Sequence, residues 1–389
     1  MISIKDVYNN VDDSNIDTVE LEGEYELEAS YKEEEAAVYP MKDVKVDKGF
    51  YTVFELKRKY DTNRKIILDS SFQREDVWKQ RQKAELIESV LMGLPLPIFY
   101  FNQDKFGNLV VIDGRQRLTA LFQYIDNKYN LGNLKILSEY NNKKFMDLEP
   151  IMKSKIEDYQ IQAHVILPPT PDRIKFDIFD RVNRAGIQLN KQEIRNALYQ
   201  GIATETLNEV IRDSKYFHLC TGNTFLNSKR MKEKYIILRF IAFYLYLSNK
   251  LVDEKGQQYE YKNDIDDLLG KTMDYMNSCD NKTIYEIKDV TEKGLENSYY
   301  YLGEDAFRLL KGEKRSPINM NIFETVMFVM HQLPQKNDNL KTKIIEKFKI
   351  LLEDKIFLDS IGNHRDNWAK ISVRFDLANE IVKDVIGID

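Results

Sequence analysis

The sequence has few of the residues that bind metals or form disulfides. Of its 389 residues, two are cysteine and four are histidine. Cys220 and Cys279 make no metal-ligand spacing with each other or with any histidine, at His164, His218, His331 or His364. We therefore predict no structural zinc and assign no metal ligand to these residues. Two cysteines without a partner suit a reducing compartment.

Long apolar stretches are also missing. No window approaches the roughly 18 consecutive apolar residues of a transmembrane helix, and the start of the sequence lacks the basic and apolar regions of a signal peptide. We therefore expect a cytoplasmic protein with no membrane partner. The hydrophobic content of 43% is ordinary for a globular chain, and the length has room for about two or three domains.

Charge is distributed unevenly along the chain. Residues 1–40 contain 12 acidic and 2 basic residues, a net charge of −10, so the overall charge of −6 leaves +4 for residues 41–389. Within this acidic arm, five glutamates from Glu20 to Glu28 alternate with other residues, which suits an edge strand or a solvated segment. A second interpretation is that the arm folds over a basic groove and competes with a polyanion.

The apolar pattern predicts an α+β domain followed by helices. Strands are predicted at 65–68, 97–101, 109–112 and 161–167, a hairpin turn at 104–108, and amphipathic helices at 78–93 and 115–124. Beyond residue 203 nearly every segment carries helical spacing. We predict an acidic arm over 1–40, an α+β domain over 41–202 and an all-helical domain over 203–389, the last mediating self-association or contact with an effector partner.

The most informative motif runs from Asp113 to Thr119, where a strand leads through a glycine into a helix. Free amides of a first helical turn, beside the planar donors of Arg115 and Arg117, form a favourable site for phosphate. Gly114 allows a close backbone approach, while Asp113 can hold a divalent ion and Gln116 can position a water. The structural alternative is that Asp113 caps the helix and the arginines form surface ion pairs.

Two further clusters carry similar donors. Gln73 and Arg74 lie between a predicted strand and a predicted helix, and two Asn/Arg pairs flank a loop that contains Gly186. These pairs are Asn183 with Arg184 and Arg195 with Asn196. Basic residues scattered on helices more often mark a solvated face, so each cluster alone is weak evidence.

The order of these motifs resembles the GmrSD-type restriction endonuclease N-terminal domain family. The resemblance rests on Phe72-Gln73-Arg74 with Trp78, Gly93-Leu94-Pro95-Leu96-Pro97, Asp113-Gly114-Arg115-Gln116-Arg117, and the segment from Asn183 through Leu189-Asn190 to Ala197. It covers residues 45–200 closely. It implies a ParB/sulfiredoxin-like α+β domain whose Asp113–Arg117 motif binds a nucleoside triphosphate, with Mg²⁺ as the candidate ion. Arg115 replaces the glutamine of the common form of this motif, which leaves the nucleotide preference open.

The resemblance also implies a function in antiviral, restriction-like defence. Our leading hypothesis is a nucleoside triphosphate hydrolase with Asp113, Gln116 and Arg117 as catalytic residues. The residues expected to bind nucleotide or phosphate are Gln73, Arg74, Gly114, Arg115, Arg117, Thr119, Asn183, Arg184, Arg195 and Asn196. One alternative is a non-catalytic module that binds DNA or senses nucleotide, and another is a ParB-like DNA-nicking nuclease.

Neither a domain found in relatives nor one apparent motif adds a function to this chain. Multi-domain relatives carry a C-terminal HNH nuclease, but the four histidines here are far apart and none lies in such a context, so we predict a stand-alone member without it. His364-Arg365-Asp366 imitates a kinase catalytic loop, yet Ile371 occupies the position where that loop has asparagine. We interpret this triplet as a coincidence.

Overall fold

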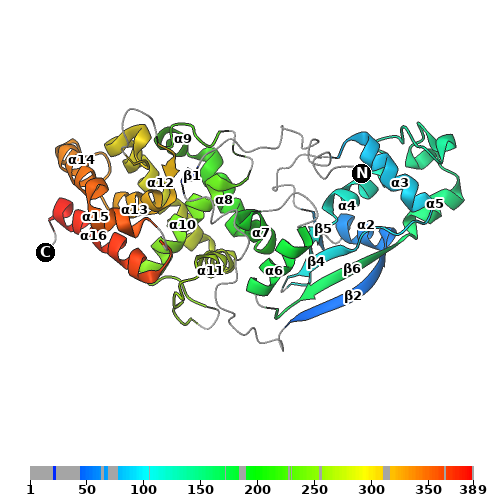
Figure 1. The fold of residues 1–389 in the computed structure, drawn as a ribbon, viewed down its shortest axis with the longest axis horizontal. Helices are drawn as coiled ribbons and strands as arrows, with labels where there is room; N and C mark the ends of the chain where they lie inside the picture. The colour runs from blue at the N-terminus through cyan, green and yellow to red at the C-terminus, as the bar shows by residue number, and fades with distance from the viewer. Residues whose placement is uncertain are drawn as a thin grey trace, which may run out of the picture. The chain divides into compact units, whose positions relative to one another are not determined.

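The chain forms two compact units (Figure 1). The computed structural model describes residues 21–22, 44–62, 65–68, 78–104, 106–170, 172–183, 190–226, 228, 230–253, 256–309, 316–362 and 365–387. The α/β unit comprises Ser30–Leu189 and Asn196–Leu198, and the helical unit comprises Met1–Ala29, Asn190–Arg195 and Tyr199–Asp389. The predicted α+β class, with a helical second half, is confirmed.

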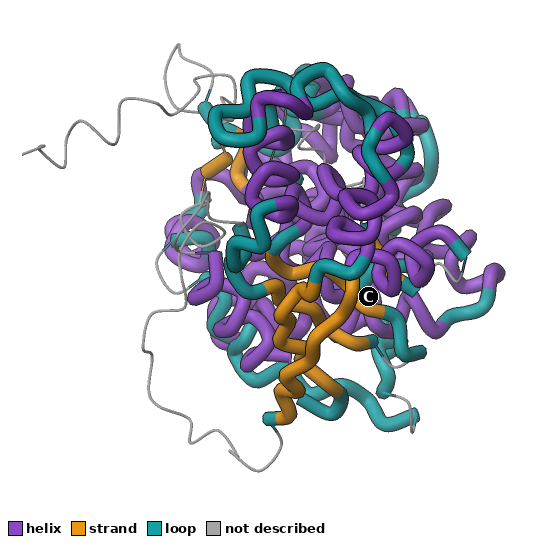
Figure 2. Tube along the Cα trace, turned by 90° about the vertical axis from the view of Figure 1, so that its right-hand side faces the viewer, coloured by secondary structure: helices purple, strands orange, loops and turns teal. Residues whose placement is uncertain are grey.

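The α/β unit is built on a mixed five-stranded sheet with the strand order β2-β6-β4-β5-β3. Figure 2 draws the strands in orange. Strands β2 and β6 pair antiparallel, as do β4 and β5, whereas β6 with β4 and β5 with β3 pair in parallel. The strands are β2 (Lys45–Thr52), β3 (Ile66–Ile67), β4 (Phe99–Gln103), β5 (Leu109–Asp113) and β6 (Gln160–Leu167). The central strand β4 thus lies between β5, its hairpin partner, and β6, which follows about 60 residues later in the chain.

The predicted hairpin between β4 and β5 is confirmed. One carboxylate oxygen of Asp104 accepts the backbone N–H groups of Phe106 and Asn108, both at 2.8 Å. Such bonds from an aspartate to the backbone that follows it favour a tight turn. The register of the hairpin shifts between Tyr100 and Phe101, so that Tyr100 pairs with Asp113 at the end of β5. This irregularity lies directly beside the predicted phosphate-binding motif.

Helices cover one face of this sheet and part of the other. Figure 1 shows α2 to α5 on one side, where Phe99, Phe101 and Val111 join the main core of the unit. On the second face α6 packs on β5, whose Val110 and Ile112 are buried. The helices of this unit are α2 (Val53–Asp61), α3 (Gln80–Leu91), α4 (Arg115–Ile125), α5 (Pro150–Glu157) and α6 (Asp172–Asn183), with short 3₁₀ turns at Ser138–Tyr140 and Phe145–Asp147.

The helical unit packs around two apolar helices. All eleven residues of α13 are buried, and α10 packs against it. The elements of this unit are α8 (Ile202–Asp213), α9 (Lys215–Cys220), α10 (Lys232–Leu247), α11 (Ile265–Ser278), α12 (Asn281–Leu302), a 3₁₀ turn (Gly303–Asp305), β7 (Ile318–Asn319), α13 (Met320–Met330), α14 (Asp338–Glu353), α15 (Lys355–Ser360) and α16 (Trp368–Ile386). Helix α7 (Lys191–Leu198) contributes Lys191 to Arg195 to this unit.

The N-terminal part of the chain adds a strand to the helical unit. Strand β1 (Leu21–Glu22) pairs in parallel with β7, and Leu21 is buried. The short strand that the alternating pattern allowed in the acidic arm is therefore present at these two residues. In the part of the chain that the structure describes, no helix has the length and apolar character needed to cross a bilayer.

Candidate phosphate-binding site

The turn between β5 and α4 depends on Gly114. Its backbone is left-handed, with φ 95° and ψ 6°, a region that side chains rarely adopt. A Cβ atom at this position would lie 2.1 Å from Cδ1 of Phe99. Glycine is required here because the turn is left-handed and because the ring of Phe99 fills the space that a Cβ atom would need. The backbone at Gly114 therefore approaches the protein's own core.

The alternative in which Asp113 caps this helix is wrong, because Gly114 is the N-cap residue. With a glycine there, no N-cap side chain accepts the first amides of α4. The positive end of the helix therefore begins immediately after Asp113, and this is the arrangement that favours an anion.

Arg117 is held by the protein itself. Its side chain is 11% exposed, and it donates to the carbonyl oxygens of Pro97 and Ile98 and, at 2.7 Å, to Oδ2 of Asp113. The guanidinium also lies 4.1 Å from the ring centroid of Phe99. Burial lowers the pKa of Arg117, while the Asp113 carboxylate acts in the opposite direction. Arg117 thus fixes the start of β4 against α4 and orients Asp113, and its contact with a phosphate stays a prediction.

Other side chains of the motif are more accessible. The Asp113 side chain is 39% exposed, and Arg115, Gln116 and Thr119 are half-buried. Oε1 of Gln116 is buried without a hydrogen-bond partner among the described residues. A buried amide oxygen without a partner is costly to a protein, so Gln116 is a group that a bound water or ligand would satisfy.

Several predicted site residues are not brought to this turn by described contacts. Gln73, Arg74 and Arg184 lie outside the described residues, and Asn183 ends α6 with a side chain that is not described. Asn196 is fully buried on α7. Their predicted contacts with a nucleotide stay predictions.

Arg195 is engaged in a buried ion pair of the helical unit. It is 0% exposed and donates to Oδ1 of Asp266 on α11 at 2.5 Å, while Lys191 donates to the other oxygen at 2.8 Å. Burial alone raises the pKa of Asp266, but the charges of Lys191 and Arg195 hold it below its usual value. A capping box starts α7, because Asn190 accepts the N–H of Glu193 and Glu193 accepts the N–H of Asn190, as the spacing of these two residues allows.

Sequence reasoning missed the aromatic residues beside the motif. Phe99 supports both Gly114 and Arg117, and Tyr100 pairs across the sheet with Asp113 on one side and His164 on the other. The rings of Tyr100 and His164 meet edge to face, with centroids 5.3 Å apart. The strands that carry these residues were predicted, but their order in the sheet was not.

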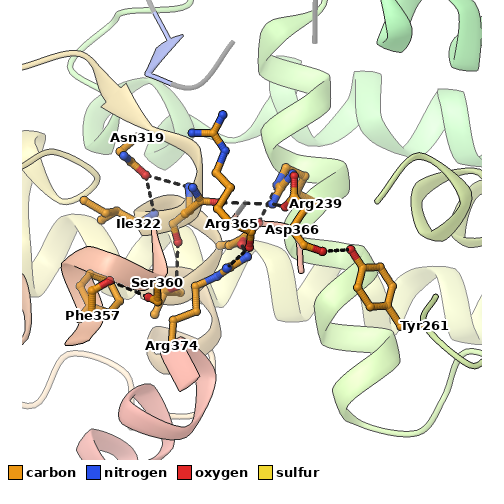
Figure 3. Close-up of polar contacts among 12 residues, drawn as sticks. Arg239, Tyr261, Asn319, Ile322, Phe357, Ser360, Arg365, Asp366 and Arg374 are labelled. Atoms are coloured by element: carbon orange, nitrogen blue, oxygen red, sulfur yellow. Dashed lines mark hydrogen bonds and ion pairs between the residues drawn. The ribbon is translucent and has the colours of Figure 1, made fainter. Parts of the chain in front are cut away.

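A second arginine cluster lies in the core of the helical unit (Figure 3). Glu324 binds both Arg239 and Arg374, and all three side chains are 0% exposed. Asp366 accepts from Arg239 at 2.7 Å and its backbone carbonyl accepts from Tyr261. Burial opposes the charge of Arg239, but Asp366 and Glu324 hold its pKa above the ordinary value. Asp366, part of the kinase-like triplet, thus has a structural role here.

Among the described residues, no three histidine, cysteine, aspartate or glutamate side chains gather as a metal site. Asp113 is the carboxylate that the β5–α4 turn offers, and a metal bound there would take most of its other ligands from a nucleotide and water, as Mg²⁺ commonly does.

A known protein-family model covers this motif. No curated protein and no solved structure matches the chain. Residues 54–200 match the model of the GmrSD restriction endonuclease N-terminal domain, a span that runs from α2 to the end of α7 and includes the whole β5–α4 turn. Over these residues the chain is similar to the GmrSD restriction endonuclease N-terminal domain, as the order of its motifs predicted.

Proposed function

We propose that this chain binds a nucleoside triphosphate at the β5–α4 turn and hydrolyses it in a restriction-like, antiviral defence function. The observation that carries the proposal is the left-handed turn at Gly114. It places a 39% exposed carboxylate, Asp113, directly beside the first-turn amides of α4. Together these groups offer donors for phosphate oxygens and an acceptor for a metal ion or a water.

The roles follow from exposure. Asp113 or Gln116 would orient the attacking water, and Arg115 would offset phosphate charge. Arg117, whose donors already bind protein acceptors, would act as a positioning residue that holds Asp113. Mg²⁺, bound through Asp113 and the phosphates, would neutralise developing charge. Arg74, Asn183 and Arg184 retain the phosphate-binding roles predicted from the sequence.

Phosphate release from a panel of nucleoside triphosphates with Mg²⁺ tests this proposal. We expect Asp113→Asn and Gln116→Ala each to lower the rate, the former by about a hundredfold or more. Asp158→Asn is the matched control, because Asp158 is an exposed aspartate at the end of α5. A folded Arg117→Ala protein as active as the parent would contradict the proposal.

One observation favours a second candidate, a module that binds nucleotide or DNA without turnover. Because Arg117 is committed to Pro97, Ile98 and Asp113, the turn has fewer free donors for a transition state than its sequence suggests. Salt-dependent retention of DNA or nucleotide, with no phosphate released, would select this function.

The defence role is tested in cells. We expect expression of the parent chain, with any effector it needs, to reduce phage plating, and Asp113→Asn to remove that protection while Asp158→Asn keeps it. If the Asp113→Asn protein protected cells as well as the parent, the β5–α4 turn would not be needed for defence.

A further inference from the structure

An open strip crosses the second face of the five-stranded sheet. It begins on β2, which lies at one edge of the sheet and exposes Phe50 by 66% and Val46 by 42%. Proteins usually protect an edge strand from contact with other molecules. A strongly exposed aromatic ring on such a strand therefore indicates a surface that binds something.

The strip continues across two more strands. In the sheet register, Phe50 pairs with Gln162, Lys48 pairs with His164, and His164 pairs with Tyr100. Residues paired in a ladder share a face, and Ala163 and Val165 of β6 belong to the opposite, helix-covered core. Lys48, His164 and Tyr100 thus form a row over three strands, beside Phe50 and Gln162.

Exposure limits the strip to these strands. Gln162 and Lys48 are exposed, and His164 and Tyr100 are half-buried. Further along, Ile166, Val110 and Ile112 are buried on the side where α6 packs on β5. Figure 1 shows β2 and β6 at the margin of the unit, with α2 to α5 on the other side of the sheet.

The chemistry of the strip fits unpaired bases. Its rings offer flat apolar surfaces, Gln162 offers an amide for a base edge, and Lys48 offers one cation for a phosphate. Its members Val46, Lys48, Phe50, Gln162, His164 and Tyr100 carry no carboxylate, and the row meets one only at its far end, where Tyr100 pairs with Asp113. With a single lysine the strip has little to bind a duplex backbone, so its affinity must come from stacking, which requires bases that are not already paired.

We propose that this strip is a stacking platform for single-stranded nucleic acid. Phe50 and the edge-to-face pair of His164 and Tyr100 receive bases, while Lys48 contacts the backbone between them. Phe50 and His164 are diagonal neighbours on β2 and β6, and such side chains lie about 7–8 Å apart, comparable to the separation of bases in an extended single strand. The proposal does not rest on nucleotide hydrolysis, because its residues differ from those of the β5–α4 turn.

The test is the anisotropy of labelled oligothymidylate, and of a labelled duplex of equal length, titrated with the full chain. We expect Phe50→Ala and His164→Ala each to weaken single-strand binding by about five- to a hundredfold, while Phe50→Trp keeps it. Phe54→Ala is the matched control, since Phe54 is 54% exposed but lies on α2. It should bind like the parent.

Three results would overturn the platform. The parent protein does not bind oligothymidylate, or Phe50→Ala binds like Phe54→Ala, or Lys48→Ala alone removes binding to single strand and duplex equally. After the second or the third result, charge attraction alone would explain the binding. Phosphate release by Phe50→Ala should equal that of the parent, so a failed platform and a failed hydrolase give different results.

Discussion

The two units use arginine and carboxylate side chains in different ways. In the helical unit, Glu324 is 0% exposed and its two oxygens bind two arginines that are also 0% exposed. In the α/β unit, Asp113 has one arginine partner and is 39% exposed. Glu324 and its two arginines offer no accessible group and serve packing, whereas the second cluster leaves a carboxylate in contact with solvent at a helix N-terminus. The two clusters therefore differ in the exposure of the carboxylate, and this exposure distinguishes a candidate site from a structural ion pair.

The largest expected effect on stability concerns the buried cluster around Glu324. Glu324→Gln removes the charge that compensates Arg239 and Arg374, and breaking a buried ion pair in this way costs about 3–5 kcal/mol. We expect a correspondingly lower free energy of unfolding in denaturant titrations of the full chain. Glu260→Gln is the control, because Glu260 is exposed. A Glu324→Gln protein as stable as this control would remove the contrast between the clusters.

The second-largest expected effect on stability concerns the turn at Gly114, beside Asp113. Gly114→Ala places a Cβ 2.1 Å from Phe99 in a left-handed backbone, so we expect a loss of about 3 kcal/mol in stability. Gly93→Ala has a similar positive φ of 71° but no atom within 4 Å of the new Cβ. It should cost only about 1 kcal/mol, from backbone strain alone. Equal losses in thermal unfolding would show that Phe99 does not constrain the turn.

A smaller, pH-dependent effect probes the core of the helical unit. Burial lowers the pKa of His331 from 6.5 to about 4, and its ring packs among Phe240, Tyr244 and Phe328. The unfolded chain therefore takes up the proton first, and stability falls as the pH drops below about 6.5. We expect His331 to account for about 2 kcal/mol of the loss between pH 7.5 and pH 5. His331→Gln should flatten that part of the profile, and an unchanged slope would contradict the burial argument.

The smallest effect on stability is expected at Asp113. Asp113→Asn removes a partly exposed pair with Arg117, worth about 1 kcal/mol or less, while the amide oxygen can still accept. A loss as large as that of Glu324→Gln would show that Asp113 belongs to the architecture. The contrast between the two clusters is supported if the Asp113→Asn protein has nearly the parent's free energy of unfolding but strongly reduced phosphate release.

Local signals in the sequence predicted much of the α/β unit. The β4–β5 hairpin follows from apolar runs around a turn with Asp104, and the capping box at Asn190 follows from its spacing to Glu193. The glycine at position 114 marked the strand-to-helix turn correctly. Such features depend on residues close together in the chain, which is why one sequence suffices to find them.

Local signals do not reach features in which distant segments decide the environment of a residue. Arg239, on an apolar helix, is fully buried against Glu324, 85 positions away, and nothing near it in the chain predicts that partner. Trp368, a large apolar residue at the start of α16, is 38% exposed. Apolar spacing shows which face of a helix is buried, but it does not show whether a charged residue on that face meets a counter-charge from another helix.

The sequence by itself determined the elements, the turn at Gly114 and the family resemblance of residues 54–200, because short-range backbone preferences and ordered motifs carry that information. Only the tertiary structure decided which arginines are occupied and which carboxylate is accessible. It also brought Tyr100 beside both Asp113 and His164. The physical reason is that burial and ion pairing depend on contacts between residues far apart in the chain, which no local pattern encodes.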